Sequence, residues 1–268
     1  MMGGKTKAGK SGPRAGRDLL GQAQDLIYDA WEYADPMKRA ALARKALKIS
    51  ADCGDAYVLL AEAAAGPAKA LELYRKGVEA GERALGKHAF ENDAGHFWGI
   101  LETRPYMRAR AGLAQSLWDH GRHDDALAHY RELLRLNPND NQGIRYVLAA
   151  RLLELGRDRE LGALVKEHRD DGRAFMIWTT ALFAFRTDGD SPKSRRALAQ
   201  ALESNSHVPA YLLGDKPIPR ALPDYTGLGD ESEAMCWAAE NIKAWQATCG
   251  TLAWLAERIN TEKPPLLN

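Results

Sequence analysis

Apolar residues recur at intervals of three and four along the chain from Asp18 to about Arg186. Alanine is abundant in this stretch, and runs of β-branched residues are absent. That spacing places the apolar side chains on one face of a helix, whereas a half-buried strand would show strict alternation. The pattern therefore predicts a succession of amphipathic helices and an all-α fold.

Proline and glycine divide the pattern where helix ends are expected. Three dipeptides place a capping residue before a proline at the first helical position: Asp35-Pro36, Gly66-Pro67 and Ser191-Pro192. Gly121 and Gly156 fall where tight turns between paired helices are expected. These signals predict short connections between helices.

A frame of about 34 residues that starts at Met107 resembles the tetratricopeptide pattern. Its matching residues are Leu113, Ala114, Gly121, Ala126, Tyr130, Leu133 and Pro138. Small residues at 114 and 126 would let two antiparallel helices cross closely. A weaker frame begins near Gln142, and related units precede and follow these two. We expect a tetratricopeptide-like helical repeat array, an α-α superhelix, with an irregular insertion and a C-terminal capping helix.

The expected organisation has five parts. Residues 1–17 read as a disordered basic tail, and residues 18–212 hold the helical repeats. Within the repeats, residues 86–104 break the period and form the insertion. Residues 213–229 are a Pro-rich loop, and residues 230–268 supply capping helices and a tail.

Charge and cysteine content limit the function classes. The 37 Lys and Arg nearly balance 36 Asp and Glu, so nucleic acid and anionic membranes are not expected partners. The three cysteines show no zinc-ligand spacing and fit a reducing, cytoplasmic location. No stretch approaches the roughly 20 apolar residues of a membrane helix, and the N-terminus lacks the apolar core of a signal peptide.

Several blocks carry a family likeness: GHFWGILETRPYMRARAGLAQ, LRLNPNDNQGIRYVLAARLLELGRD, DCGDAYVLLAEAA and HVPAYLLG. They resemble the suppressor-of-tumorigenicity-seven-like family, in the form of compact bacterial tetratricopeptide proteins, from about Leu19 to Leu255. The resemblance implies a helical-repeat fold that interacts with protein. It supplies no catalytic residues. Larger animal members are associated with membranes, which is not carried over to this chain.

In tetratricopeptide proteins, positions 2, 5, 9 and 12 of each first helix line the concave groove. The frames place Arg108, Gln115, Trp118 and Tyr146 at such positions. An arginine, an amide and two aromatic rings would suit a peptide that carries an acidic or carboxylate group. The alternative is a packed surface covered by the chain's own loops.

A second candidate site lies at the insertion, where His96, Glu102 and Arg104 precede Arg108 and Arg110. Arginines there could bind a phosphate or carboxylate. We favour an internal salt-bridge network instead, with Glu102 or Asp119 as the acidic partner. A nearby group follows no recognised metal-ligand spacing, so no metal is expected: His88, Glu91, Asp93 and His96.

The function expected from these patterns is a non-catalytic scaffold that binds a protein or peptide, with no cofactor. The alternative is a small-molecule enzyme or ligand sensor at residues 86–110, and helical-repeat RNA binding is a weaker third. Self-association is also open, because Trp237, Trp245 and Trp254 could pack against a second copy. We favour their burial within the chain.

Overall fold

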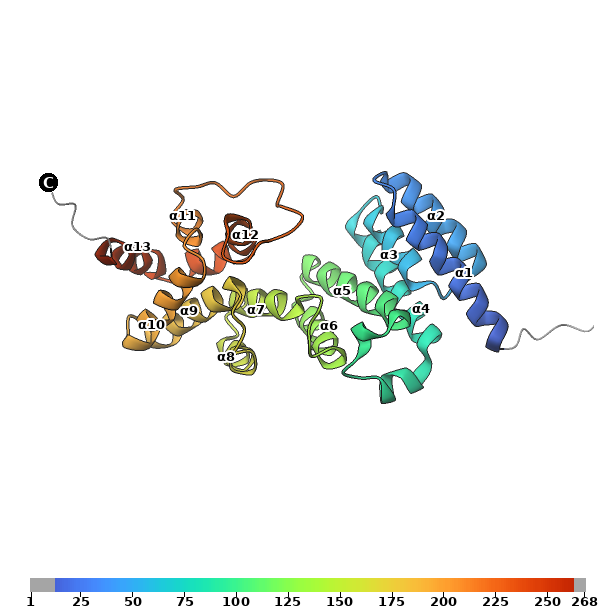
Figure 1. Cartoon of the computed structure of the whole chain (residues 1–268), viewed down its shortest axis with the longest axis horizontal. Coiled ribbons are helices and arrows are strands. Elements are labelled where there is room, and N and C mark those ends of the chain that lie inside the picture. The colour runs from blue at the N-terminus through green and yellow to red at the C-terminus, as the bar shows by residue number, and fades with distance from the viewer. Residues whose placement is uncertain (1–12, 263–268) are drawn as a thin grey trace, which may run out of the picture. The chain divides into compact units, whose positions relative to one another are not determined.

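The computed structural model describes residues 13–262, and every regular element in that range is helical (Figure 1). The chain divides into two units, one ending at Gln142 and the other beginning at Gly143. The first contains α1 (Pro13–Trp31), α2 (Pro36–Ile49), α3 (Gly54–Glu62), α4 (Pro67–Asn92), the 3₁₀ helices η1 (Phe97–Gly99) and η2 (Leu101–Thr103), α5 (Arg104–Asp119) and α6 (His123–Leu136). The second contains α7 (Ile144–Glu154), α8 (Asp158–Glu167), α9 (Ala174–Asp188), α10 (Pro192–Ser204), α11 (Val208–Leu212), α12 (Glu231–Ala247) and α13 (Thr251–Glu262). The predicted all-α class is confirmed for this part of the chain.

Proline-based helix starts lie where the sequence predicts them, since α2, α4 and α10 each begin at a proline. The Asp35 carboxylate accepts a hydrogen bond of 2.8 Å from the backbone N–H of Met37. Ser191 forms a reciprocal capping box with Ser194. These bonds satisfy backbone donors that have no partner inside the helix.

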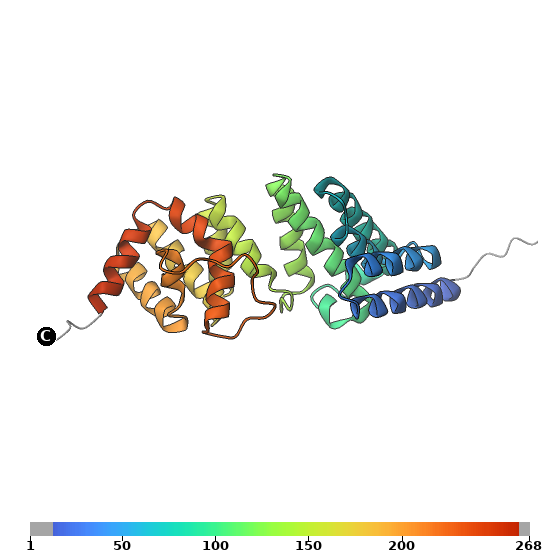
Figure 2. The same ribbon diagram turned by 90° about the horizontal axis from the view of Figure 1, so that it is seen from above.

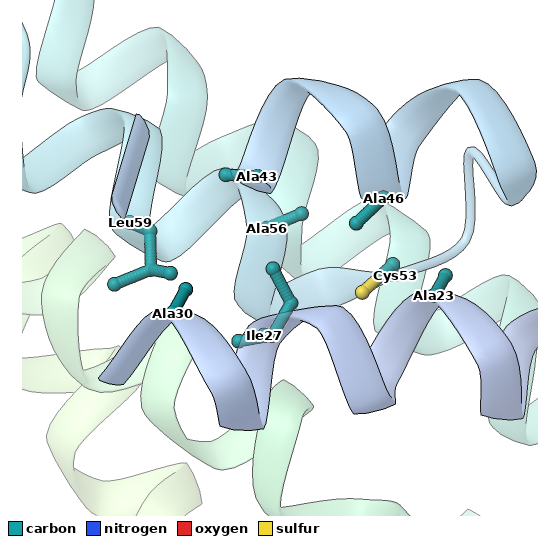
Figure 3. Close-up of a cluster of buried hydrophobic side chains, with 8 residues drawn as sticks. All are labelled: Ala23, Ile27, Ala30, Ala43, Ala46, Cys53, Ala56 and Leu59. Atoms are coloured by element: carbon teal, nitrogen blue, oxygen red, sulfur yellow. The ribbon is translucent and has the colours of Figure 1, made fainter. Parts of the chain in front are cut away.

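Small side chains allow the first helices of the first unit to pack closely. Figure 3 shows one buried cluster drawn from α1, α2 and α3: Ala23, Ile27, Ala30, Ala43, Ala46, Cys53, Ala56 and Leu59. Figure 2 shows α1 and α2 side by side. Further along, Ala114 and Ala126 are fully buried where α5 packs against α6. Both therefore occupy positions consistent with the predicted crossing of these helices.

Aromatic side chains fill the core of the second unit, where α12 packs against α7 and α9. Trp178, Trp237 and Trp245 are fully buried, with ring centroids 5.7 to 6.2 Å apart. Trp254 is 5% exposed and stacks on Phe185 at 4.5 Å. Burial of these rings inside the unit leaves little of them for a second copy of the chain.

Some boundaries differ from the expected ones. Of the tail expected at 1–17, residues 1–12 lie outside the described residues, and α1 already begins at Pro13. The insertion at 86–104 is largely helical, because α4 continues past a non-helical Gly86 (φ 69°) before η1 and η2. The Pro-rich segment forms no helix between α11 and α12, as its composition predicts (Figure 1). Residues 263–268, at the end of the expected capping region, are not described either.

Over residues 13–262, no helix combines the length and the apolar content that crossing a membrane requires.

Candidate functional site

Arg108 of α5 binds the carboxylate of Asp55, which lies at the start of α3. Its Nε and Nη2 donate to Oδ1 and Oδ2 of Asp55 at 2.8 and 2.5 Å. Asp55 has no solvent exposure, whereas the Arg108 side chain is 26% exposed. Gln24 of α1 donates a third hydrogen bond to the same carboxylate at 2.8 Å. One polar network therefore connects α1, α3 and α5.

Aromatic rings border this network on α1. The Arg108 guanidinium lies 4.9 Å from the ring centroid of Trp31, within the range of a cation–π contact. The Tyr28 ring lies 5.7 Å from Trp31 and is 45% exposed. This group of aromatic and polar side chains, Gln24, Tyr28, Trp31, Asp55 and Arg108, is called the α1–α3–α5 surface below.

Gln115 and Trp118 lie further along α5, near α6. Gln115 stands seven residues after Arg108 and so on the same face of the helix two turns later. It donates to Asp119 at 2.8 Å and accepts from the Tyr130 hydroxyl at 3.1 Å. Trp118 is only 8% exposed, and its ring lies 4.3 Å from that of His123. Trp118 thus contributes mainly to packing.

Tyr146 belongs to the second unit and lies on α7. Its hydroxyl donates to Asp171 at 2.9 Å and accepts from Arg145 at 2.8 Å. Its ring lies 5.3 Å from that of Phe175. Burial and the bond to the Asp171 carboxylate raise the pKa of Tyr146 to about 12. The Tyr146 hydroxyl therefore stays protonated at any physiological pH.

The insertion residues are not brought together as a polar site. Arg104 donates from Nε to the backbone oxygen of Trp98 at 2.9 Å, and its guanidinium lies 5.5 Å from that ring. His96 and Glu102 are exposed. Within the described residues, no hydrogen bond or ion pair joins these three predicted site residues.

The expected internal salt bridge exists, but its acidic partner differs from the predicted ones. Arg108 pairs with Asp55 rather than with Glu102 or Asp119, because α3 packs directly against α5. Arg110 instead donates to the hydroxyl of Tyr106 on its own helix. No cluster of three or more metal-ligating side chains occurs between residues 13 and 262.

A family model described as ST7 protein matches residues 15–261, nearly the whole chain. This chain is a member of the ST7 protein family. Among curated ST7-family relatives, the suppressor of tumorigenicity 7 protein-like of Bos taurus is 28% identical over 260 residues, covering 88% of this chain and 46% of the relative. The protein ST7 homolog of Drosophila pseudoobscura pseudoobscura is 27% identical over 259 residues, which cover 88% of this chain and 48% of that relative. The chain therefore spans about half the length of these curated relatives.

Sequence reasoning missed Asp55 in this ST7-family chain, although the repeat frame contains a signal for it. Asp55 and Arg108 are 53 residues apart. The same offset relates Ala61 of α3 to Ala114 of α5, both at the small-residue position of the frame. Opposite charges at equivalent positions of two adjacent repeats could have identified the pair.

Proposed function

We propose that this ST7-family chain is a tetratricopeptide-like scaffold that binds a protein or peptide and has no catalytic activity of its own. The order of helix packing supports the repeat architecture. In the first unit, α1, α3 and α5 are the first helices of successive pairs, and α1 packs against α3 and α3 against α5. The second helices, α2 and α4, pack against the first helix of the following pair, α3 and α5 respectively. In the second unit, α7, α8 and α9 follow the same order. Stacked helix pairs produce this arrangement. A bacterial source, which the resemblance implied, stays a prediction.

The α1–α3–α5 surface is the part of the first unit best suited to a partner. The observation that carries the proposal is the Arg108 guanidinium over the Trp31 ring, beside an exposed Tyr28. Arginine, tryptophan and tyrosine are enriched in the energetically dominant parts of protein interfaces. In the proposed array these first helices line the groove. A peptide with an apolar side chain and an acidic group fits this chemistry.

Asp55 limits what Arg108 can offer to a partner. Two of its five N–H donors are already engaged, so a ligand would use the remaining three and the exposed guanidinium face. Gln115 extends the surface along α5, whereas the nearly buried Trp118 adds little area. Groove roles for Trp118 and Tyr146 stay predictions. The alternative, a small-molecule enzyme or ligand sensor at residues 86–110, also stays a prediction.

We also infer a reducing compartment such as the cytoplasm. The three cysteines, Cys53, Cys236 and Cys249, are all free thiols. Free cysteines are usual in cytosolic proteins, whereas secreted proteins commonly pair theirs. Partial reduction and mass mapping of the protein from its host would detect a disulfide, which would contradict this inference.

Site-directed photo-crosslinking in the host tests the scaffold proposal. A benzophenone amino acid replaces the exposed Tyr28 in one variant and the exposed Arg44 of α2 in a control variant. We expect discrete protein adducts from position 28 that are weak or absent from position 44. The adduct at position 28 should decrease when Arg108→Lys is added. Equal adduct patterns from both positions, or none from position 28, would contradict the proposal.

A further inference from the structure

A basic pocket lies between α4, α5 and α6 of the first unit, and the proposed partner surface does not account for it. The pocket has a volume of about 210 Å³. Its polar lining is Arg75 of α4, Arg110 of α5, Arg122 before α6, and Asp125 and His129 of α6. Leu113 and Leu117 of α5 and Ala128 of α6 complete the wall. Side chains from three consecutive helices thus converge on one cavity.

Positive charge exceeds negative charge in this lining. Arg122 pairs with Asp125, with Nη2 and Oδ2 2.6 Å apart. The guanidinium groups of Arg75 and Arg110 form no ion pair with a carboxylate of the lining residues. Arg75 is exposed and takes part in no hydrogen bond or ion pair with the described residues. The lining therefore carries a formal excess of two positive charges when His129 is neutral.

A neighbouring acid does not cancel this excess. Glu132 interacts electrostatically with Arg110, and that interaction contributes to the lowered pKa of Glu132 after the hydrogen bonds from Arg135. Those hydrogen bonds are 2.7 and 2.8 Å long and occupy both carboxylate oxygens. Glu132 is therefore already neutralised by another arginine.

Two buried nitrogens of the lining residues lack hydrogen-bond partners. Nε of Arg110 and Nδ1 of His129 are both buried and unsatisfied. Polar atoms left buried without a partner cost free energy, and native structures contain few of them. A ligand with several acceptor oxygens would satisfy such groups after small side-chain rotations. The pocket is thus polar, cationic and incompletely hydrogen-bonded.

We propose that this pocket binds a phosphate group. Arginine forks match tetrahedral oxyanions, and a phosphate group carries roughly 1.5 to 2 negative charges at neutral pH. A carboxylate would neutralise only half of the excess charge. Asp125, the single acid among the lining residues, is already paired with Arg122.

The His129 ring is a built-in reporter of occupancy. Desolvation, followed by the charge of Arg110, lowers the pKa of His129 to about 4. Arg122 acts in the same direction, Asp125 and Glu132 act in the opposite one, and Arg75 faces the same pocket from α4. A bound dianion opposes the arginines. We expect the pKa of His129 to rise when phosphate binds.

Nuclear magnetic resonance on the full chain tests the proposal. Inorganic phosphate is titrated against sodium chloride of equal ionic strength, and the His129 ring signals are assigned with His129→Gln. We expect saturable phosphate shifts that chloride does not reproduce. Arg75→Gln should weaken phosphate binding about tenfold, since one charge-assisted contact is lost. This exposed substitution replaces one good helix former by another and should leave the fold intact.

Matched controls decide the outcome. Arg44→Gln removes an exposed arginine from α2 and should bind phosphate as the unmodified chain does. O-phosphoserine binding more tightly than inorganic phosphate would support a phosphate monoester as the ligand, and the reverse order would support the free ion. Equal responses to chloride or acetate would overturn the proposal. Undiminished phosphate binding by Arg75→Gln would also overturn it. The same result follows if Arg44→Gln loses as much phosphate affinity as Arg75→Gln.

Discussion

A carboxylate with no solvent exposure needs compensation for the hydration it loses, and Asp55 receives it from three hydrogen bonds. Two come from Arg108 and one from Gln24. Such a pair contributes less to net stability than its short distances suggest, because both ions lose solvent. Removing only one partner is different, since it leaves a buried charge without its counter-ion. The Asp55–Arg108 pair is therefore sensitive to single substitutions.

We predict that Arg108→Met lowers the free energy of opening of α3 and α5 by about 3 kcal/mol. Arg108→Lys should lower this free energy of opening by less, because lysine keeps the positive charge and loses only the bidentate geometry. Native-state hydrogen exchange of the α3 and α5 amides measures both effects. In the double variant Asp55→Asn with Arg108→Met, this free energy of opening should fall by less than the sum of the decreases in the two single variants. A loss below about 1 kcal/mol in Arg108→Met would show that Asp55 is hydrated there.

The Arg108 example also shows what local sequence can reveal about a site residue. A basic cluster at the start of a helix predicts that some of its arginines form internal salt bridges, and Arg108 does. Candidates close in sequence, Glu102 and Asp119, were the wrong partners. The partner, Asp55, lies 53 residues away, and only the packing of α3 on α5 brings it close. The Arg75–Arg110–His129 pocket was missed for the same reason, since it draws on three helices.

At the scale of elements, α4 and α5 approach through positions without side chains. A Cβ added to Gly81 would lie 2.8 Å from Cβ and 3.1 Å from Cα of Tyr106. At Gly77 it would lie 3.0 Å from Cβ of Ala109. Glycine lowers helix propensity, so its presence inside α4 has a packing reason. The close approach of these two helices depends on it.

We predict that Gly81→Ala destabilises the first unit by about 1–3 kcal/mol, because α5 must shift to relieve the clash. Gly21→Ala is the matched control within α1, where an added Cβ meets nothing within 4 Å. It should stabilise the chain by up to about 1 kcal/mol through helix propensity. Urea unfolding followed by circular dichroism compares the two variants. Stabilisation by both substitutions would show that α4 and α5 are less closely packed than described.

Helix boundaries were predicted best where one residue determines them locally. Asp35, Ser191 and the prolines after them fix the starts of α2 and α10 through short-range hydrogen bonds. The continuation of α4 beyond Gly86 was missed, because a glycine with positive φ reads as a helix end. Packing of Phe90 against Phe97 and Tyr106 holds this last segment in place. That contact joins residues whose proximity no local pattern shows.

At the scale of the whole molecule, both units contain free thiols, one in the first and two in the second. Cys53 is fully buried within the first unit, whereas the second unit contains Cys236, which is partly buried, and Cys249, which is exposed. Desolvation raises the pKa of Cys53 to about 11 and also raises that of Cys236. Since the thiolate is the reactive species, both burial and a raised pKa slow alkylation. The three cysteines therefore differ in reactivity only while the units remain folded.

We predict that iodoacetamide at about pH 8 alkylates Cys249 first, Cys236 more slowly and Cys53 last in the native chain. Peptide mass mapping over time gives the three rates separately. In concentrated urea the three rates should converge, because every thiol then has an ordinary pKa near 8.5 and full access. The rate at Cys53 also reports opening of the first unit, so Gly81→Ala should increase it and Gly21→Ala should not. Native alkylation of Cys53 as fast as that of Cys249 would contradict the close packing of α1, α2 and α3 around it.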